Sequence, residues 1–232
     1  SRKKMSSQKK NKKEENVGQK INPVGMRVGE FLPWKSRWFS EKGFKDYLIE
    51  DIKIRKALKE KLKLAGINSV EIERLPKSMA VTMTVSRPGV VIGRGGTGIE
   101  DVKKYVLGII REVRKEKVKD LKIDLRVNEI KNPELSAYLV ATRIVAELER
   151  RMPHRRVVTK TIERVMASGA KGVKVVLGGR IGGAEISRVE KFQEGSVPTQ
   201  TLRENIDYAQ IPALLKRGYV GVKVWIHKKE ED

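Results

Sequence analysis

The stretch Val91-Ile92-Gly93-Arg94-Gly95-Gly96 decides how this chain folds. It contains a Gly-x-x-Gly tetrapeptide, which is a weak signal by itself. Glycine has no Cβ, so a loop of this kind can adopt positive φ and let its backbone approach phosphate groups closely. Arg94 adds a positive charge at the same place. The loop is either a ligand-binding element or a simple turn, and the segments on each side bear on that choice.

The segments around this loop alternate between helical and strand periodicity. Residues 44–65 place apolar side chains at helical spacing and precede Gly66, a typical residue just after a helix end. Residues 70–72 and 79–85 have the period of strands, with Pro76-Lys77-Ser78 as the turn. After the loop comes a second long helix, and residues 121–127 form a third alternating strand. The apolar stripe of that helix is Ile99, Val102, Val106, Ile109 and Val113.

This order of elements is that of a type II KH domain, in which the Gly-x-x-Gly loop joins two helices and holds the phosphates of about four nucleotides. The rival is a dinucleotide-binding fingerprint, because Gly93, Gly95 and Gly98 also have G-x-G-x-x-G spacing. A Rossmann unit needs a full buried strand before the first glycine, but Pro88-Gly89 leaves only residues 90–92. It also needs an acidic residue at the far end of the next strand, whereas Asp120 and Asp124 fall before and inside that strand. The KH interpretation is favoured, and a turn without a ligand remains the alternative.

A second helix-and-sheet pattern begins after Asn132-Pro133. Residues 134–151 and 155–168 are predicted helices, separated by Pro153 and ended by Gly169. Residues 173–175, 184–186 and 220–226 are predicted strands. We therefore expect an α+β protein of two domains: an N-terminal type II KH domain (α-β-β-α-α-β) at residues 44–131, and a C-terminal α/β domain at residues 132–228.

The two ends of the chain are expected to lie outside these domains. Residues 1–16 hold seven Lys and Arg with two Glu, which predicts a disordered basic tail, either a solvated charge run or an RNA-anchoring arm. Residues 17–43 are predicted to be an extended arm without regular elements, and residues 229–232 an acidic tail end. The aromatic residues of the arm either pack on the domain behind it or stack on bases: Phe31, Trp34, Trp38 and Phe39.

The composition indicates a polyanionic partner. The chain of 232 residues has 51 Lys and Arg against 29 Asp and Glu, a formal net charge of +22. Nucleic acid is the usual partner, because Lys and Arg release condensed counterions when they bind phosphates. An acidic membrane is the main rival, but no apolar run approaches the roughly 20 residues of a spanning helix. With no cysteine, only two histidines and no catalytic constellation, we expect no enzyme activity, no metal site and no cofactor.

Four arginines surround the predicted helix break at Pro153. In the helix that follows, Arg156, Lys160 and Arg164 share one face, while the apolar residues share the opposite one. This division predicts a packed side and a side that faces RNA phosphates, and a solvated basic face is the alternative. The arginines at the break are Arg150, Arg151, Arg155 and Arg156.

Longer motifs resemble the bacterial-type S-three family of small-subunit ribosomal proteins, in order, over about residues 17–228. They are VGQKINPVGMR at 17–27, PW at 33–34, RPGVVIG at 87–93, GAKGVKV at 169–175, GRIGGAEISR at 179–188, GSVP at 195–198, LRENIDY at 202–208 and GVKVWI at 221–226. The resemblance implies a KH domain and a C-terminal α/β domain in the head of the small subunit. Its partners would be ribosomal RNA and neighbouring head proteins, with no membrane and no small-molecule substrate.

Members of this family also line the path by which messenger RNA enters, and their arginine pair there matches Arg155-Arg156. A third basic position downstream falls on Thr159, with Lys160 adjacent. The loop departs from the family too, because many bacterial members carry two lysines where this chain has Arg94-Gly95. The resemblance implies a ribosomal location in the cytoplasm of a bacterium or in a bacterial-type organelle.

The expected RNA contacts fall into three sets. The KH loop supplies Gly93, Arg94, Gly95 and Gly96; the basic helix region supplies Arg150, Arg151, Arg155, Arg156, Lys160 and Arg164; the C-terminal domain supplies Lys171, Lys174, Arg180 and Arg188. Two other functions stay open: a KH-type RNA-binding regulator that acts outside the ribosome, and a nucleotide-dependent oxidoreductase, which would bind its cofactor saturably.

Overall fold

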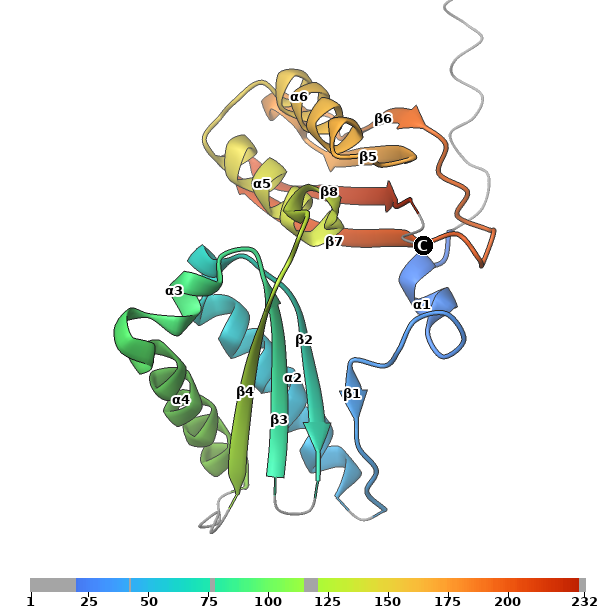
Figure 1. The fold of residues 1–232 in the computed structure, drawn as a ribbon. Helices are drawn as coiled ribbons and strands as arrows, with labels where there is room; N and C mark the ends of the chain where they lie inside the picture. Colours follow the sequence, from blue (N-terminus) through green and yellow to red (C-terminus); the bar gives the residue numbers. More distant parts are fainter. Residues whose placement is uncertain (1–19, 42, 76–77, 115–120, 230–232) are drawn as a thin grey trace, which may run out of the picture.

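The computed structural model describes residues 20–41, 43–75, 78–114 and 121–229, which form two α+β units with a four-stranded sheet each (Figure 1). The predicted fold class is confirmed. The predicted basic tail at residues 1–16 lies outside the described residues, as do residues 230–232 of the acidic end.

The first unit has the predicted α-β-β-α-α-β order. Its elements are α2 (Phe44–Lys61), β2 (Ile67–Arg74), β3 (Ser78–Val85), α3 (Pro88–Ile92), α4 (Thr97–Arg114) and β4 (Lys122–Glu129). β2 and β3 are antiparallel, and β4 runs parallel to β3. A short 3-10 turn follows α2, and Gly66 ends it in the left-handed conformation at a φ of 66°, as the sequence predicts.

The core of this unit lies between the sheet and its two long helices. Val81, Met83 and Val85 of β3 are fully buried, while the residues between them face the other side of the sheet. α4 meets the sheet with Val102, Val106 and Ile110, each four residues apart. The predicted stripe is correct in its first half, but Ile110 is buried more deeply than Ile109 because it continues this four-residue spacing.

The second unit packs two helices on one face of an antiparallel sheet (Figure 1). Its elements are α5 (Ala137–Glu149), α6 (His154–Ala167), β5 (Gly172–Gly179), β6 (Arg188–Gly195), β7 (Ile206–Leu215) and β8 (Gly218–His227). The strand order is β6-β5-β8-β7. β8 supplies the core with alternate residues, Val220, Val222, Val224 and Ile226, which are at most 2% exposed.

The strand predictions for this unit need correction. Residues 184–186 are not a strand, because Gly182 and Gly183 take positive φ values of 65° and 81° and turn the chain. β6 therefore begins only at Arg188. β7 was not predicted at all, since Pro212 interrupts its sequence. Proline is tolerated there because β7 is an edge strand.

The arm contains regular structure, which corrects the prediction that it has none. α1 (Pro23–Arg27) packs beside β7, and β1 (Ser36–Arg37) joins the first sheet parallel to β2. Arg27 is only 2% exposed, and its guanidinium donates hydrogen bonds of 2.6–3.3 Å to five carbonyl oxygens. The acceptors belong to Pro23, Thr199, Thr201, Leu202 and Glu204. The arm thus binds the second unit at one end and the first sheet at the other.

The aromatic residues of the arm divide between packing and exposure. The ring centroid of Trp38 lies 5.3 Å from that of Phe44 and 5.5 Å from that of Tyr47, and its Nε1 donates to Asp51 at 2.8 Å. Packing on the domain is therefore confirmed for Trp38. The other three are exposed by 47% (Phe31), 66% (Trp34) and 85% (Phe39).

A buried ionic cluster holds α2 against β2 and α4. Glu50 and Asp51 are fully buried on α2. Arg74 of β2 lies 2.6 Å from Glu50 and donates from Nε to Asp51 at 3.0 Å, and Arg114 of α4 lies 2.6 Å from Glu50. Removing one partner of such a cluster leaves a buried charge without compensation, so loss of any one of these residues should destabilise the fold.

Candidate RNA interface

The glycine loop joins two helices, as a KH loop does. α3 ends at Ile92 with Gly93 as its cap, and α4 begins at Thr97. Gly93, Gly95 and Gly96 all have positive φ, between 63° and 82°. A Cβ on Gly95 or Gly96 would meet no atom within 4 Å, so this side of the loop is open to a ligand. Arg94 is exposed beside them.

The element before the loop decides between a KH loop and a dinucleotide-binding loop. Residues 88–92 form helix α3, whereas a dinucleotide fingerprint requires a strand there. The glycine at position 98 has a packing role instead. A Cβ on Gly98 would lie 2.5 Å from the carbonyl oxygen of Val91, so glycine at this position lets α4 start close against α3.

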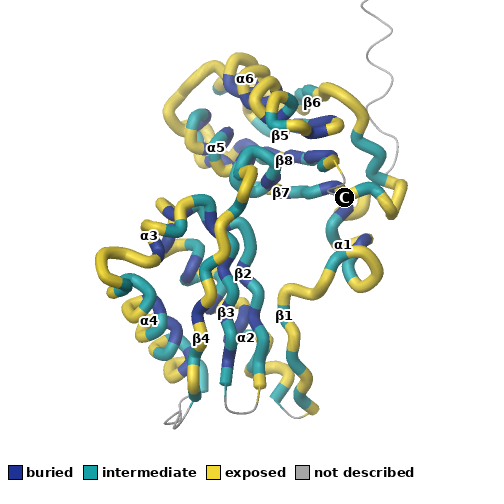
Figure 2. Tube along the Cα trace, viewed as in Figure 1, coloured by how far each residue is buried: buried dark blue, intermediate teal, exposed yellow. Residues whose placement is uncertain are grey.

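Helix α6 separates its residues by face, as the sequence predicts. Val157, Val158, Thr161, Ile162 and Val165 are buried against the sheet. The opposite side carries Arg155, Arg156, Lys160 and Arg164, all exposed. Figure 2 shows this contrast along α6, with exposed residues on its outer side and buried ones where it meets the sheet. We call these four basic residues the α6 face.

The α6 face keeps most of its charge unpaired. Among described residues, the one carboxylate within 4.0 Å of it is that of Glu190 on β6, which lies 4.0 Å from Arg155. Glu190 already has closer partners, Arg188 at 2.7 Å and His154 at 3.0 Å. The guanidinium of Arg155 is 78% exposed and remains free to bind an external anion.

Arg150 and Arg151 occupy the turn between α5 and α6, and both are exposed. Arg151 has a φ of 62°, unusual for a residue with a side chain, which lets the chain reverse before Pro153. Arg151 lines a cavity of about 830 Å³. Its lining also includes Arg180, Lys216 and Arg217, together with Glu149.

The four residues expected in the C-terminal domain do not form one site. Lys171 lies 3.6 Å from Glu204, and Arg188 lies 2.7 Å from Glu190. Arg180 donates from Nε to the carbonyl of Ala184 at 2.8 Å. Lys174 stands apart from them on the sheet face opposite the helices, with its Nζ 5.5 Å from the ring centre of Trp225. Sequence reasoning missed Trp225 and Lys223 on that face, although the alternation of buried residues along β8 points both away from the core.

The described part of the chain offers neither a metal-binding cluster nor a membrane-spanning helix. No group of three His, Asp or Glu residues in it is placed to hold a metal ion. None of its helices has the length and apolar character needed to cross a membrane.

Comparison with known proteins agrees with this geometry. Residues 53–135 match the family model of the KH domain, and residues 144–226 match that of "Ribosomal protein S3, C-terminal domain". The chain is similar to proteins named small ribosomal subunit protein uS3. It is 43% identical to that of Desulfitobacterium hafniense, over 92% of this chain and 94% of the relative. It is 46% identical to that of Caldicellulosiruptor saccharolyticus, over 91% and 92%.

These matches run through both domains and across nearly the whole length of the relatives, so the resemblance seen in the sequence motifs is confirmed: the chain belongs to the uS3 family of small-subunit ribosomal proteins.

Proposed function

We propose that this chain is a structural constituent of the small ribosomal subunit, where it binds ribosomal RNA and neighbouring head proteins and guides incoming messenger RNA. Its relatives carry the name of a small-subunit protein, and they are bacterial, which supports a place on bacterial ribosomes in the cytoplasm. Residues 44–131 would act as the KH unit and residues 132–228 as the second unit. Such a role needs positioning and charge, and no bond chemistry.

The observation that carries the messenger part is the α6 face. Its charges are exposed, and Glu190 carries the one carboxylate of the described residues within 4.0 Å of them, while the other side of the same helix is buried in the core. Lys160 follows Arg156 by four residues and precedes Arg164 by four, so the three side chains form one line along the helix. Lys160 rather than Thr159 would therefore supply the third basic contact. Contacts of this kind hold the RNA backbone without reading its bases.

The KH loop would bind ribosomal RNA more weakly than is usual in its family. Its open glycines leave the backbone accessible to phosphates, and Arg94 supplies the charge between them. Gly95 stands where many bacterial relatives carry a second lysine, so one cation is lost. The basic residues at the helix break, Arg150 and Arg151, would add charge next to the α6 face.

Photocrosslinking in assembled subunits tests the messenger contact. A photoreactive residue replaces Lys160 in one variant and Lys45 in another, and both are incorporated into subunits that carry a messenger. Both positions are exposed, but Lys45 lies on α2 of the first unit. We expect crosslinks to messenger from position 160 and not from 45. Equal or absent messenger crosslinks, in subunits of normal composition, would contradict the role of the α6 face.

The other candidate function is that of a KH-type RNA-binding regulator outside the ribosome, which the open glycine loop alone would also support. Sedimentation through a sucrose gradient at high salt separates the two. A structural constituent stays with small subunits in equal copy number, whereas a regulator dissociates from them because its few phosphate contacts weaken with salt.

A further inference from the structure

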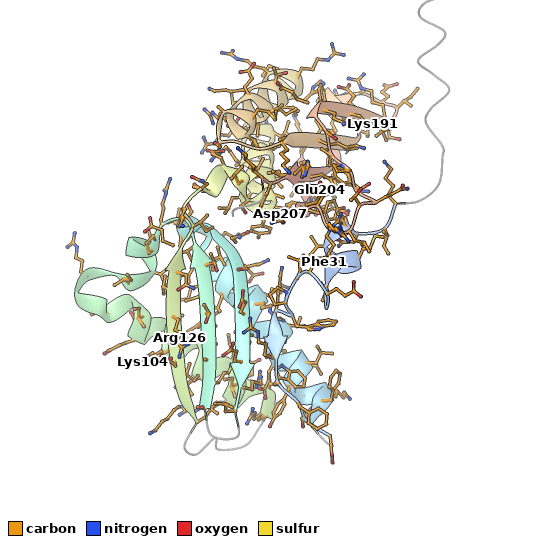
Figure 3. The ribbon with its side chains drawn as sticks, turned by 45° about the vertical axis from the view of Figure 1, so that its right-hand side comes forward. Phe31, Lys104, Arg126, Lys191, Glu204 and Asp207 are labelled. Atoms are coloured by element: carbon orange, nitrogen blue, oxygen red, sulfur yellow. The ribbon has the colours of Figure 1, made fainter. Side chains whose placement is uncertain are left out.

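The second sheet has a face that α5 and α6 do not cover. Residues of β8 at even positions lie in the core, so Lys223 and Trp225 point to the other side. The strand register places five further side chains beside them on that side. We call this set the open face: Lys174, Lys191, Gln193, Tyr208, Gln210, Lys223 and Trp225. Figure 3 labels Lys191, which comes from the edge strand β6.

The open face is arranged in two rows across the strands. In the first, Trp225 lies between Tyr208 of β7 and Lys174 of β5, and Gln193 follows on β6. In the second row, Lys191 and Lys223 flank Val176, and Gln210 lies beyond Lys223. Each row thus combines lysine with one glutamine, and the first row adds two aromatic rings.

The charged side chains of the open face are all lysines. The acidic residues of these four strands, Glu190, Glu194 and Asp207, are in register with buried core residues and so point to the helix side. Burial and the nearby Lys20 and Lys191 lower the pKa of Lys174. Lysines that crowd one another in this way are stabilised by a bound polyanion, since it offsets their mutual repulsion.

The aromatic pair adds a stacking surface to this charge. The ring centroids of Tyr208 and Trp225 lie 5.0 Å apart at an angle of 41°, and both side chains are half-buried. The hydroxyl of Tyr208 donates to Gln210 at 3.1 Å, which ties the two rows together. Aromatic rings beside lysines on a sheet surface are the usual platform for unpaired bases, because stacking works for every base.

We propose that the open face binds unpaired RNA nucleotides, with Lys191 and Lys223 on phosphates, Tyr208 and Trp225 against a base, and the glutamines on base edges. The proposal rests on the chain being an RNA-binding protein, but not on the α6 face, which lies on the other side of the same sheet. The second domain would then hold RNA on both of its faces. An acidic protein segment is the competing occupant, and it would need the lysines but not the stacking.

Affinity and salt dependence test this proposal together. The full chain carries Arg155→Ala and Arg156→Ala throughout, so that these two arginines of the α6 face do not contribute. The probe is a single-stranded oligouridine of about ten nucleotides. Lys191→Gln with Lys223→Gln should weaken binding and lower the log–log salt slope by about 1.4, because two phosphate contacts are lost. The control is Lys45→Gln with Lys56→Gln, two exposed lysines of α2 with the same change of charge.

Tyr208→Leu should act differently, because stacking releases no counterions. It should weaken binding at least about fivefold, the lower limit for one stacked base, and leave the slope unchanged. Ultraviolet crosslinking of the oligouridine, followed by mass spectrometry, should place adducts in peptides from β7 or β8. The crosslink needs no substitution, so it also covers the case in which Tyr208→Leu unfolds the domain.

The proposal is wrong if the open-face pair changes the slope no more than the α2 pair does, since the lysines then act only through net charge. It is also wrong if no adduct maps to β7 or β8, or if folded Tyr208→Leu keeps full affinity, the result expected for an acidic protein partner. A failure of the messenger crosslink from position 160 would leave all of these results unaffected, so the two proposals can fail separately.

Discussion

Replacing Arg155 and Arg156 by alanine should weaken the hold of assembled subunits on messenger RNA in a salt-dependent way. Both side chains are exposed on the outer side of α6, and Glu190, whose carboxylate lies 4.0 Å from Arg155, has a closer partner in Arg188. Alanine is the best helix former, so α6 itself should persist. The loss should therefore come from missing phosphate contacts and not from unfolding.

The expected size follows from the number of contacts. Each lost contact to single-stranded RNA lowers the log–log salt slope by about 0.7, so two lower it by about 1.4. Between about 50 mM and about 200 mM salt, this corresponds to a change of about sevenfold in the ratio of wild-type to mutant affinity. The wild type should bind better at low salt, and its advantage should shrink by this factor at high salt.

The assay is a titration of messenger fragments of unrelated sequence against wild-type and mutant subunits at several salt concentrations. Lys45→Ala with Lys56→Ala on α2 controls for net charge. Thr159→Lys adds a cation to the exposed side of α6 and should raise the slope by about 0.7. An unchanged slope in the double-alanine subunits, with normal assembly, would refute the reasoning and assign the α6 face to solvent. A defect confined to assembly would place it against ribosomal RNA.

Three further outcomes are expected. Gly95→Asp should weaken RNA binding by the full chain more than Gly95→Asn does. Both residues tolerate the positive φ of 63°, but only aspartate repels phosphate. Equal loss of binding by the two variants in a filter-binding assay would contradict this. Arg74→Met should cost about 3–5 kcal/mol and lower Tm by roughly 6–20 °C in calorimetry, since it leaves two buried carboxylates short of a partner. The hydrogen bond from His227 holds the pKa of Glu204 below its ordinary value of 4.5. The contribution of this pair to folding stability is therefore complete above about pH 4.5 and is lost as the pH falls through the lowered pKa. Glu204→Gln should therefore flatten the acid side of the stability curve in urea unfolding, and an unchanged curve would count against the pairing.

The KH fold was predictable because its signals are local. Apolar periodicity located α2, α4 and the strands, and the Gly-x-x-Gly stretch lies between α3 and α4 as expected. The sides of α6 were predictable for the same reason, since one helix turn determines which residues share a face. What periodicity missed were features that depend on partners distant in the chain. β7 exists because it pairs with β8, although Pro212 obscures its pattern.

Only the tertiary structure decided which charges remain free. From the sequence alone, Arg27 would be expected to lie on the surface like most arginines. It is buried because five carbonyl oxygens of the arm and of the loop before β7 accept hydrogen bonds from its guanidinium. Arg188 looks equivalent to Arg155 in the sequence, yet it is the closer partner of Glu190.

The sequence by itself determined the family, the order of elements in the first unit and the positive charge, since these depend on residues read along the chain. It could not determine where that charge gathers. The α6 face and the open face arise when helices cover one side of a sheet, which directs every second residue of each strand to the other side. Lys174, Lys191 and Lys223 are therefore neighbours only because β5, β6 and β8 pair in that register.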